Sequence, residues 1–363
     1  MYKFIKLFFS ATILLLLSNT FAYADRLSDA IQSEACGDSD SDACGGECTQ
    51  TNNVITIATA GNDDGGVTDA DSGNVKDSCN EKPDQYRITF YKAGVCKADI
   101  FDPTATSNPT VAPNCYNFFV DEAGKTIILS HDAGTGKITQ NRSLVTGAFN
   151  LQLGTYDYAY VITDNHLEVK HEQTFSEAMQ GYSAGASYSS GPTCWTNGVV
   201  TTYTNATNAQ RGHSADDVKS FGDDGGAKTS LAMTCGATNA ASPVFNTEII
   251  ENMAEEPGVE NATFLARTGS TYQSIPGSSD TAAGKLLRND DITTAETHLE
   301  AARIFYPIKF ATPLVIGPKT KLEMSFGVSG SVSVDFQTDG SNNLISLKAG
   351  ADPFTMKFTA SEN

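Results

Sequence analysis

The chain has 363 residues, with 43 acidic and 24 basic side chains and a formal net charge of −19. Because this charge repels phosphate groups, binding to nucleic acid or to anionic lipid is not expected. The length is sufficient for one large domain or two ordinary ones with a substantial hydrophobic core.

Residues 1–24 have the layout of a cleavable secretory signal peptide. Lys3 and Lys6 precede the apolar run Ala11 to Leu17, and a small-x-small cleavage sequence ends the segment. We expect the mature chain to begin near Asp25 and to fold in the periplasm, at the cell surface or outside the cell. It contains no stretch of the roughly 20 apolar residues that a membrane helix needs, so no integral membrane segment is predicted. Because this compartment is oxidising, the eight cysteines are predicted to form disulfides rather than metal or redox sites.

Residues 25–82 form an acidic, cysteine-rich N-terminal arm. Gly, Asp, Ser and Asn dominate it, and this composition alone is typical of a flexible chain. A zinc site is one alternative, since Cys44 and Cys48 have suitable spacing, but no second pair of ligands follows them. We therefore predict that the arm is stapled by disulfides among its four cysteines, which are Cys36, Cys44, Cys48 and Cys79.

A short acidic loop in the arm is a candidate calcium site. Asp69, Asp71 and Asp77 stand at its first, third and ninth positions. Carboxylate oxygens at these positions, with a backbone carbonyl at the seventh, suit a hard cation such as calcium. The loop resembles calcium loops of the EF-hand and thrombospondin types, although it departs from both at several positions. A solvated acidic turn without an ion is the alternative, and no other cofactor is predicted.

Beyond Pro83, apolar and polar residues alternate with the period of a β-strand. The alternation runs over residues 86–90 and again over 156–162, so each segment is predicted to turn one apolar face towards a core. Residues 166–175 are expected to return beside 156–162 through a turn at 164–165, as in an antiparallel sheet.

Residues 177–290 are a long insertion rich in Gly, Ser, Thr and Asn. A structureless loop of this length is improbable in a compact domain, so it should contain hairpins of its own. A disulfide between Cys194 and Cys235 is predicted to brace it. A second disulfide, between Cys96 and Cys115, would close a loop of about 20 residues and contribute roughly 3 kcal/mol of stability.

The best helix in the chain is predicted over residues 294–303. Thr293 and Glu296 have the spacing of a capping box, with Thr293 as the N-cap. The helix would be short, and it would be the only one in an otherwise β-rich chain.

The C-terminal part has the clearest strand pattern. Residues 322–328 alternate, a turn is expected at 329–330, and 332–336 are predicted to return as the second strand of a hairpin. Further strands are expected near 344–347 and 354–358. One apolar face per strand predicts two sheets packed face to face.

The predicted fold is therefore mainly β. Residues 83–176 and 291–363 are expected to form an antiparallel β-sandwich of the immunoglobulin or jelly-roll type. It would carry a loop-rich insertion, one short helix and a disulfide-stapled N-terminal arm.

No catalytic group stands out from the sequence. Residues 181–185 match the G-x-S-x-G nucleophile elbow, but the sequence after them does not predict the helix that such an elbow needs. His166 and His171 are five apart on a predicted strand, so they should face opposite sides and be partly exposed. The chain is accordingly predicted not to be an enzyme, with a hydrolase as the alternative that paired catalytic side chains would support.

Three segments resemble uncharacterised exported β-sandwich proteins of marine bacteria: Tyr86 to Cys96, Leu153 to Tyr156 and Leu314 to Pro318. The resemblance is one of pattern and covers about half of the mature chain. It implies a β-sandwich at the cell surface or in the periplasm, and it brings no catalytic residue.

We therefore predict a structural or adhesive component of the bacterial cell surface, acting through contacts with its own copies or other proteins. The alternative is a soluble carbohydrate-binding module that contacts a polysaccharide. In that case Tyr156, Tyr158 and Tyr160 would form an aromatic platform on an exposed face, unless these side chains belong to the core.

Overall fold

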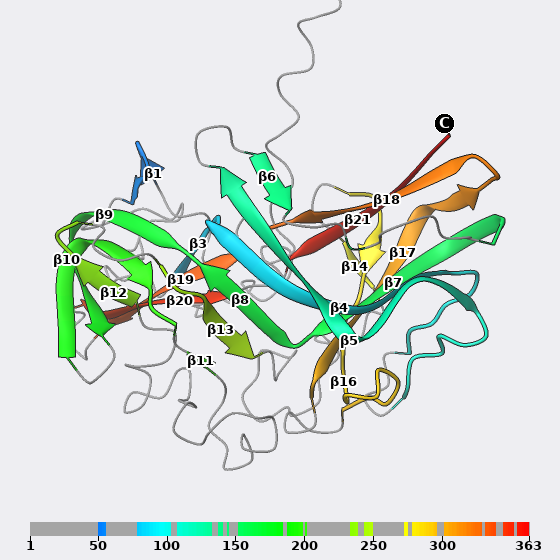
Figure 1. Cartoon of the computed structure of the whole chain (residues 1–363), viewed down its shortest axis with the longest axis horizontal. Coiled ribbons are helices and arrows are strands. Elements are labelled where there is room, and N and C mark those ends of the chain that lie inside the picture. The colour runs from blue at the N-terminus through cyan, green and yellow to red at the C-terminus, as the bar shows by residue number, and fades with distance from the viewer. Residues whose placement is uncertain are drawn as a thin grey trace, which may run out of the picture.

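The structure is a computed structural model, and its strands belong to four sheets (Figure 1). No helix occurs among the residues described, so the described chain is mainly β. The described residues are 50–55, 78–102, 107–132, 137–140, 144, 152–183, 187–198, 200–201, 233–238, 243–249, 272–274, 278–295, 301–328, 331–338, 344–351 and 354–362.

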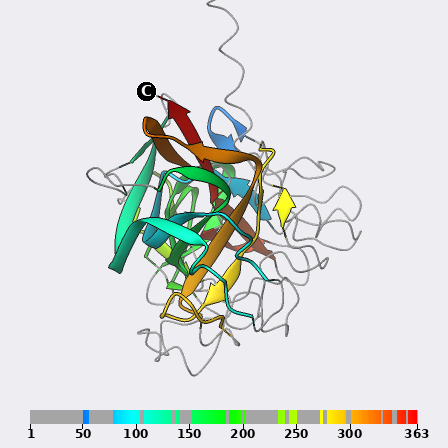
Figure 2. The ribbon, with the colours of Figure 1, turned by 90° about the vertical axis from the view of Figure 1, so that its right-hand side faces the viewer.

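The largest sheet has 11 strands and occupies the centre and right of Figure 1. Its main path runs β11-β13-β8-β4-β7-β17-β15-β14, while β5 pairs with β4 and β6, and β16 pairs with β17. Seen from the side, its long strands curl instead of lying flat (Figure 2). Its strands are β4 (Gln85–Cys96), β5 (Cys115–Asp132), β6 (Lys137–Gln140), β7 (Gly154–Asp164), β8 (His166–Lys170), β11 (Val200–Thr201), β13 (Asn246–Ile249), β14 (Gln273–Ser274), β15 (Thr281–Ala282), β16 (Lys285–Leu287) and β17 (Arg303–Ile316).

Three smaller sheets accompany the large one. The five-stranded sheet lies at the left of Figure 1 and consists of β1 (Gln50–Thr51), β2 (Val54–Ile55), β9 (Glu172–Ser183), β10 (Ser187–Thr196) and β12 (Met233–Gly236). The three-stranded sheet consists of β3 (Ser78–Glu81), β19 (Val332–Thr338) and β20 (Leu344–Ala351). The two-stranded sheet consists of β18 (Thr320–Gly327) and β21 (Thr355–Glu362).

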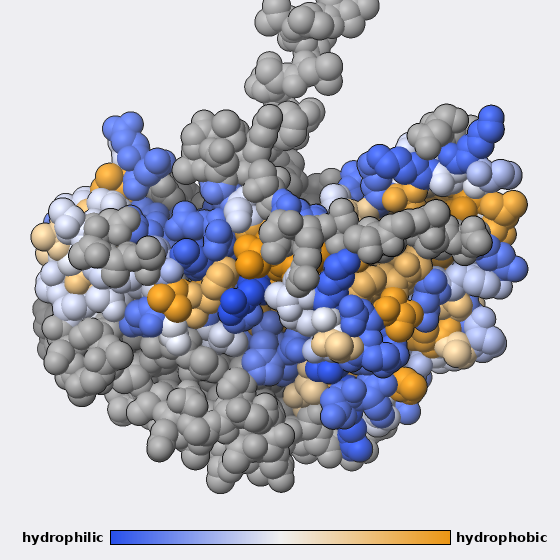
Figure 3. Space-filling model, viewed as in Figure 1, coloured by the Kyte–Doolittle hydropathy of each residue, from blue (hydrophilic) through white to orange (hydrophobic). Residues whose placement is uncertain are grey.

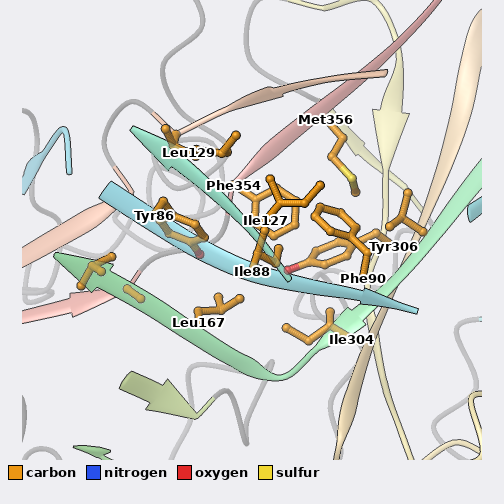
Figure 4. Close-up of a cluster of buried hydrophobic side chains, with 14 of the residues drawn as sticks. Tyr86, Ile88, Phe90, Ile127, Leu129, Leu167, Ile304, Tyr306, Phe354 and Met356 are labelled. Atoms are coloured by element: carbon orange, nitrogen blue, oxygen red, sulfur yellow. The ribbon is translucent and has the colours of Figure 1, made fainter. Parts of the chain in front are cut away.

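The main core lies between the large sheet and the C-terminal strands (Figure 4). Phe354, directly before β21, is its centre: its ring centroid lies 6.0 Å from that of Tyr86, 6.3 Å from Phe90 and 5.5 Å from Tyr306. Tyr86, Ile88 and Phe90 are all buried, so the alternation over 86–90 correctly predicted which face of β4 turns inward. Aromatic pairs at these separations add stability beyond the area that they bury.

The turn predicted at 164–165 is wrong, because β7 and β8 run in the same direction. Both strands pair antiparallel with β4, β7 with its second half and β8 with residues 85–87. The side chain of Asn165 is buried, and its amide donates a hydrogen bond to the carbonyl of Ala301 at 3.2 Å. Asn165 is therefore an irregular residue between two strands that continue in the same direction, in the manner of a β-bulge, and its bond to Ala301 holds it there.

The C-terminal hairpin predicted between residues 322–328 and 332–336 is also wrong. β18 pairs with β21, whereas β19 pairs with β20 and β3. The Ser331 N–H donates to the carbonyl of Val328 at 3.2 Å, and residues 329–330, where the turn was predicted, lie outside the described residues. The alternating pattern correctly marked two strands, but it carried no information on their partners.

The helix predicted over 294–303 is not seen. Thr294 instead forms an antiparallel bridge with the last residue of β16, and its N–H donates to Asn108 Oδ1 at 2.9 Å. β17 then begins at Arg303, and residues 296–300 lie outside the described part of the chain. In a helix capped by Thr293, the Thr294 N–H would be one of the first N–H groups, which have no partner within the helix. Here the side chain of the distant Asn108 accepts its hydrogen bond instead.

Candidate functional site

Both disulfides predicted outside the N-terminal arm are confirmed. Cys96 of β4 is bonded to Cys115 of β5, and Cys194 of β10 is bonded to Cys235 of β12. In each pair the two residues lie directly opposite one another on antiparallel strands, with Cα atoms 4.1 and 4.0 Å apart. The sequence separations are 19 and 41, so each bond also restricts the unfolded chain.

The predicted sites in the N-terminal arm lie almost entirely outside the described residues. Cys79 belongs to β3, while the disulfide pairing of the arm and its calcium loop both stay predictions. Within the described ranges, no three His, Cys, Asp or Glu side chains are placed to hold a metal ion, and no helix could cross a bilayer. The predicted residues outside these ranges are Cys36, Cys44, Cys48, Asp69, Asp71 and Asp77.

The tyrosines of β7 do not form one exposed platform. Tyr156 and Tyr160 are fully buried, and they belong to different core clusters on the two faces of the sheet. Tyr158 alone is half-buried, at the edge of the second cluster. The prediction of a single apolar face over residues 156–162 is therefore incomplete, because other segments pack on both faces of β7.

An aromatic rim lies beside β7, made by the half-buried Tyr158 and Tyr272, the exposed Asp99 and the buried Phe101 beneath them. The Tyr272 ring centroid lies 5.6 Å from that of Phe101 and 6.2 Å from that of Tyr158, with the two tyrosine planes tilted by 37°. Asp99 Oδ1 accepts a hydrogen bond from the Tyr272 hydroxyl at 2.7 Å and another from the Phe101 N–H at 3.1 Å. Tyr158 and Tyr272 are far in sequence from each other and from Asp99 and Phe101, so no local pattern predicted the rim.

Two carboxylates, Asp99 and Asp157, act on the tyrosines of the aromatic rim, while Lys285 Nζ lies 5.5 Å from the Phe101 ring centroid. Burial raises the pKa of the Tyr272 hydroxyl, and its hydrogen bond to Asp99 raises it further. Burial also raises the pKa of Tyr158, with smaller contributions from Asp99 and Asp157. Aromatic faces beside carboxylate acceptors can bind a sugar ring or a cation.

The loop closed by Cys96–Cys115 is anchored by a buried lysine. Lys285 of β16 is 1% exposed, and its Nζ donates to the carbonyls of Asp102 at 2.6 Å and Ser107 at 2.8 Å. Burial lowers the pKa of Lys285 to about 8, although the nearby Asp102 charge acts in the opposite direction. The Thr294 hydroxyl donates to the same Ser107 carbonyl at 2.7 Å, so the loop is bonded to the segment before β17 at several points.

A cluster of charged side chains surrounds the irregularity between β7 and β8. Asp164 Oδ1 lies 2.5 Å from His166 Nδ1, and Asp164 Oδ2 accepts the Tyr91 hydroxyl at 2.8 Å. The Arg303 guanidinium stacks 3.6 Å from the centroid of the Tyr91 ring. Burial by itself would raise the pKa of Asp164, but the hydrogen bonds from His166 and Tyr91 outweigh burial and lower it. Burial and the Asp164 charge raise the pKa of Tyr91 to about 12.

Asp291 completes this cluster from the loop after β16. Its side chain is 5% exposed and lies 3.1 Å from Arg303 Nε and 3.1 Å from Lys92 Nζ. Two carboxylates therefore face the Arg303 guanidinium and the Lys92 amine, and each carboxylate has more than one partner. The cluster joins β4, β7 and β17 and balances its own charge, so it stabilises this region without presenting a reactive group.

His166 and His171 face opposite sides of the strand, as predicted, but their surroundings differ. His166 is half-buried beside Asp164, whereas His171 is only 3% exposed. The expectation that both are partly exposed is wrong for His171. The strand continues from β8 into β9 and carries His171 into the core between two sheets.

The G-x-S-x-G segment is not a nucleophile elbow. Gly181 and Ser183 end β9, and β10 follows from Ser187, so the segment joins two strands of a hairpin where the motif requires a helix. Gly181 has a packing role, because a Cβ atom there would lie 2.5 Å from the carbonyl oxygen of Met233. The match to the catalytic motif therefore carries no chemistry.

Comparisons of the chain with protein-family models, with curated proteins and with solved structures found no match. Function has therefore to be inferred from the residues themselves. Among the described residues, the surface feature best suited to contact a ligand is the aromatic rim, and the buried features are structural bonds.

Proposed function

We propose that the chain is an exported, non-enzymatic protein of the bacterial cell surface, structural or adhesive, that acts through contacts with other proteins. In this proposal residues 83–176 and 291–363 belong to one antiparallel β-sandwich, like those of exported proteins from marine bacteria. The main support is the pair of disulfides, Cys96–Cys115 and Cys194–Cys235, because such bonds persist in oxidising compartments.

The surface proposed for these contacts is the end of the large sheet formed by β7 and β17. Val315 is 63% exposed and Leu153 54%, and Figure 3 shows apolar surface gathered on this side of the molecule. Beyond Lys309, β17 pairs with β7 alone among the described strands, and the Ala311 N–H donates to Asp280 Oδ1 at 2.9 Å. The free edge is therefore the short stretch 314–316, which can accept a strand from a partner.

Fractionation and cross-linking on intact cells test this proposal. The native protein should be found at the cell surface and should cross-link to a second protein or to another copy. Val315→Lys should reduce the cross-linked fraction at least about tenfold, because a lysine on a strand edge opposes pairing. Ile292→Lys is the matched control, since Ile292 is 59% exposed but lies in the loop after β16. A periplasmic monomer without cross-links would refute the proposal.

Polysaccharide binding at the aromatic rim is a second candidate function. Its support is the half-buried pair Tyr158 and Tyr272 beside the exposed carboxylate of Asp99, a combination of stacking surface and hydrogen-bond acceptor. Affinity electrophoresis in gels containing a polysaccharide measures such binding directly. Retardation that Tyr158→Ala abolishes and Val315→Lys preserves would favour this candidate, whereas migration unaffected by any polysaccharide would reject it.

A further inference from the structure

The buried face of the strand that runs from β8 into β9 contains one titratable side chain. Burial alternates regularly along this strand, and the residues turned inward are at most 6% exposed. Apolar residues occupy both ends of the inward face, and His171 stands in its centre. The inward residues are Leu167, Val169, His171, Gln173 and Phe175.

The His171 ring differs from its polar neighbour on the same face. The Gln173 amide donates to the carbonyls of Asn53 at 3.1 Å and Thr174 at 2.8 Å. Neither ring nitrogen of His171 has a hydrogen-bond partner among the residues that the structure describes. An unbonded polar group in a core is unusual and costs stability, and a charged one there would cost more.

Asp84 is the only charged residue found to act on the ring among the described residues. Asp84 Oδ2 accepts the Glu172 N–H at 2.8 Å, and the Asp84 carbonyl accepts the His131 N–H at 2.8 Å. Lys170 and Glu172 are half-buried and alternate with His171, so they point to the other face of the strand. The charged groups of β8 and of the strands beside it are bonded elsewhere: Glu168 of β8 to Arg87 of β4, and Glu248 of β13 to the Ala351 N–H.

His171 lies between β8 and β9, where the large sheet meets the five-stranded sheet. Its N–H donates to Thr196 Oγ1 at 3.1 Å, and its carbonyl accepts the Thr196 N–H at 3.0 Å. These bonds attach the junction to the end of β10. Moving the His171 backbone away from β10 would break them.

We propose that His171 is an acid-sensitive switch, whose protonation opens the junction between β8 and the end of β10 while the sheets themselves remain folded. The inference is independent of the proposed function and would apply to either candidate partner. It rests on a buried, unbonded imidazole at a point where two sheets share one strand.

The sign of the effect follows from the burial of the ring. Burial lowers the pKa of His171 in the closed protein below its ordinary value, and the Asp84 carboxylate offsets only part of this change. The closed junction is therefore most stable above about pH 6.5 and loses stability as the pH falls. The equilibrium constant for opening should rise by up to about tenfold per pH unit, until the closed form itself is protonated.

Trp195 reports on this junction directly. It is the only tryptophan of the chain, it is 7% exposed, and it pairs with Glu172 across β9 and β10. We expect its fluorescence to shift reversibly to longer wavelength between pH 6.5 and 5, with a one-proton dependence and an unchanged far-ultraviolet circular dichroism spectrum. No shift down to pH 4.5, or simultaneous loss of the β spectrum, would overturn the proposal.

Three variants separate His171 from the other histidines. His171→Phe should abolish the shift, and His166→Gln, the matched histidine control, should retain it. Asp84→Asn keeps a hydrogen-bond acceptor but removes the charge that favours the protonated ring, so its shift at pH 5 should be larger than in the wild type. A wild-type fluorescence shift in His171→Phe would refute the switch. If His171→Phe does not fold, Asp84→Asn provides the test, and a fluorescence shift equal to that of the wild type would refute the switch.

Discussion

Replacing Lys285 by methionine should remove a rise in stability that the wild-type protein gains between about pH 8 and pH 10. The Lys285 side chain is 1% exposed and lies beneath the disulfide-closed loop, with its Nζ 5.5 Å from the centroid of the Phe101 ring. Methionine has a similar length and no charge, so it tests the ionisation of this side chain with little change in packing.

The magnitude follows from the pKa of the amine in the two states. Burial lowers the pKa of Lys285 from 10.5 to about 8, so between these values the unfolded chain binds the proton that the folded protein has released. The free energy of unfolding therefore increases with pH in this interval. At about 1.4 kcal/mol per pKa unit, the complete rise would approach about 3 kcal/mol. Below pH 8 the wild type has lost this contribution.

Urea unfolding of both proteins at half-unit steps from pH 7.5 to 10 measures the effect. The wild-type free energy of unfolding should rise over this range, and that of Lys285→Met should stay flat. Tyrosines with a raised pKa, such as Tyr91, lower stability only as the pH passes about 10, and they do so in both proteins. Parallel curves for the two proteins would refute the assignment of the rise to Lys285.

Substitutions at three further positions test the packing and the charged cluster. Gly191→Ala should lower the free energy of unfolding by about 3 kcal/mol, because a Cβ atom there would lie 2.0 Å from the backbone of Gly236. A melting temperature within a degree of the wild-type value would contradict this. Phe354→Ala should cost about 3–5 kcal/mol in urea unfolding, because the centre of the main core is emptied, and Phe354→Leu should cost much less. Arg303→Ala should lower the free energy of unfolding by about 3 kcal/mol, because the buried Asp291 would keep only Lys92 as a cationic partner. Arg303→Lys should restore part of this loss. Equal stabilities for the two variants would argue against a charge effect.

The two disulfides show how far local sequence can determine a long-range contact. Cys96 and Cys115 each terminate a strand and flank one loop, so the pairing was predictable from position alone. Cys194 and Cys235 lie 41 residues apart, and their pairing was predicted because both belong to the long insertion that it would brace. The neighbours of His171 had no such signal, since Asp84 and Thr196 approach it from distant parts of the chain.

The aromatic rim and the charged cluster were beyond the reach of sequence patterns. Tyr158 had a place in a predicted strand, but Phe101 and Tyr272 reach it from segments 57 and 114 residues away. Asp164 and Asn165 have the composition of a turn, and nothing nearby indicates that Tyr91, Ala301 and Arg303 hold them within a continuing strand. The contacts of Asp164 and Asn165 form only when segments distant in the sequence are brought together by folding.

The amino-acid sequence by itself determined that this protein is mainly β, which residues of β4 face a core, and which cysteines outside the arm are joined. These properties depend on the alternation of side chains along a strand and on the positions of strand ends, both of which are local. Only the tertiary structure decided that β18 pairs with β21, that β7 continues into β8, and that Thr294 lies in a bridge instead of a helix. Each of these outcomes depends on hydrogen bonds between residues distant in the chain, and alternation assigns a face to a side chain without naming the strand that will lie beside it.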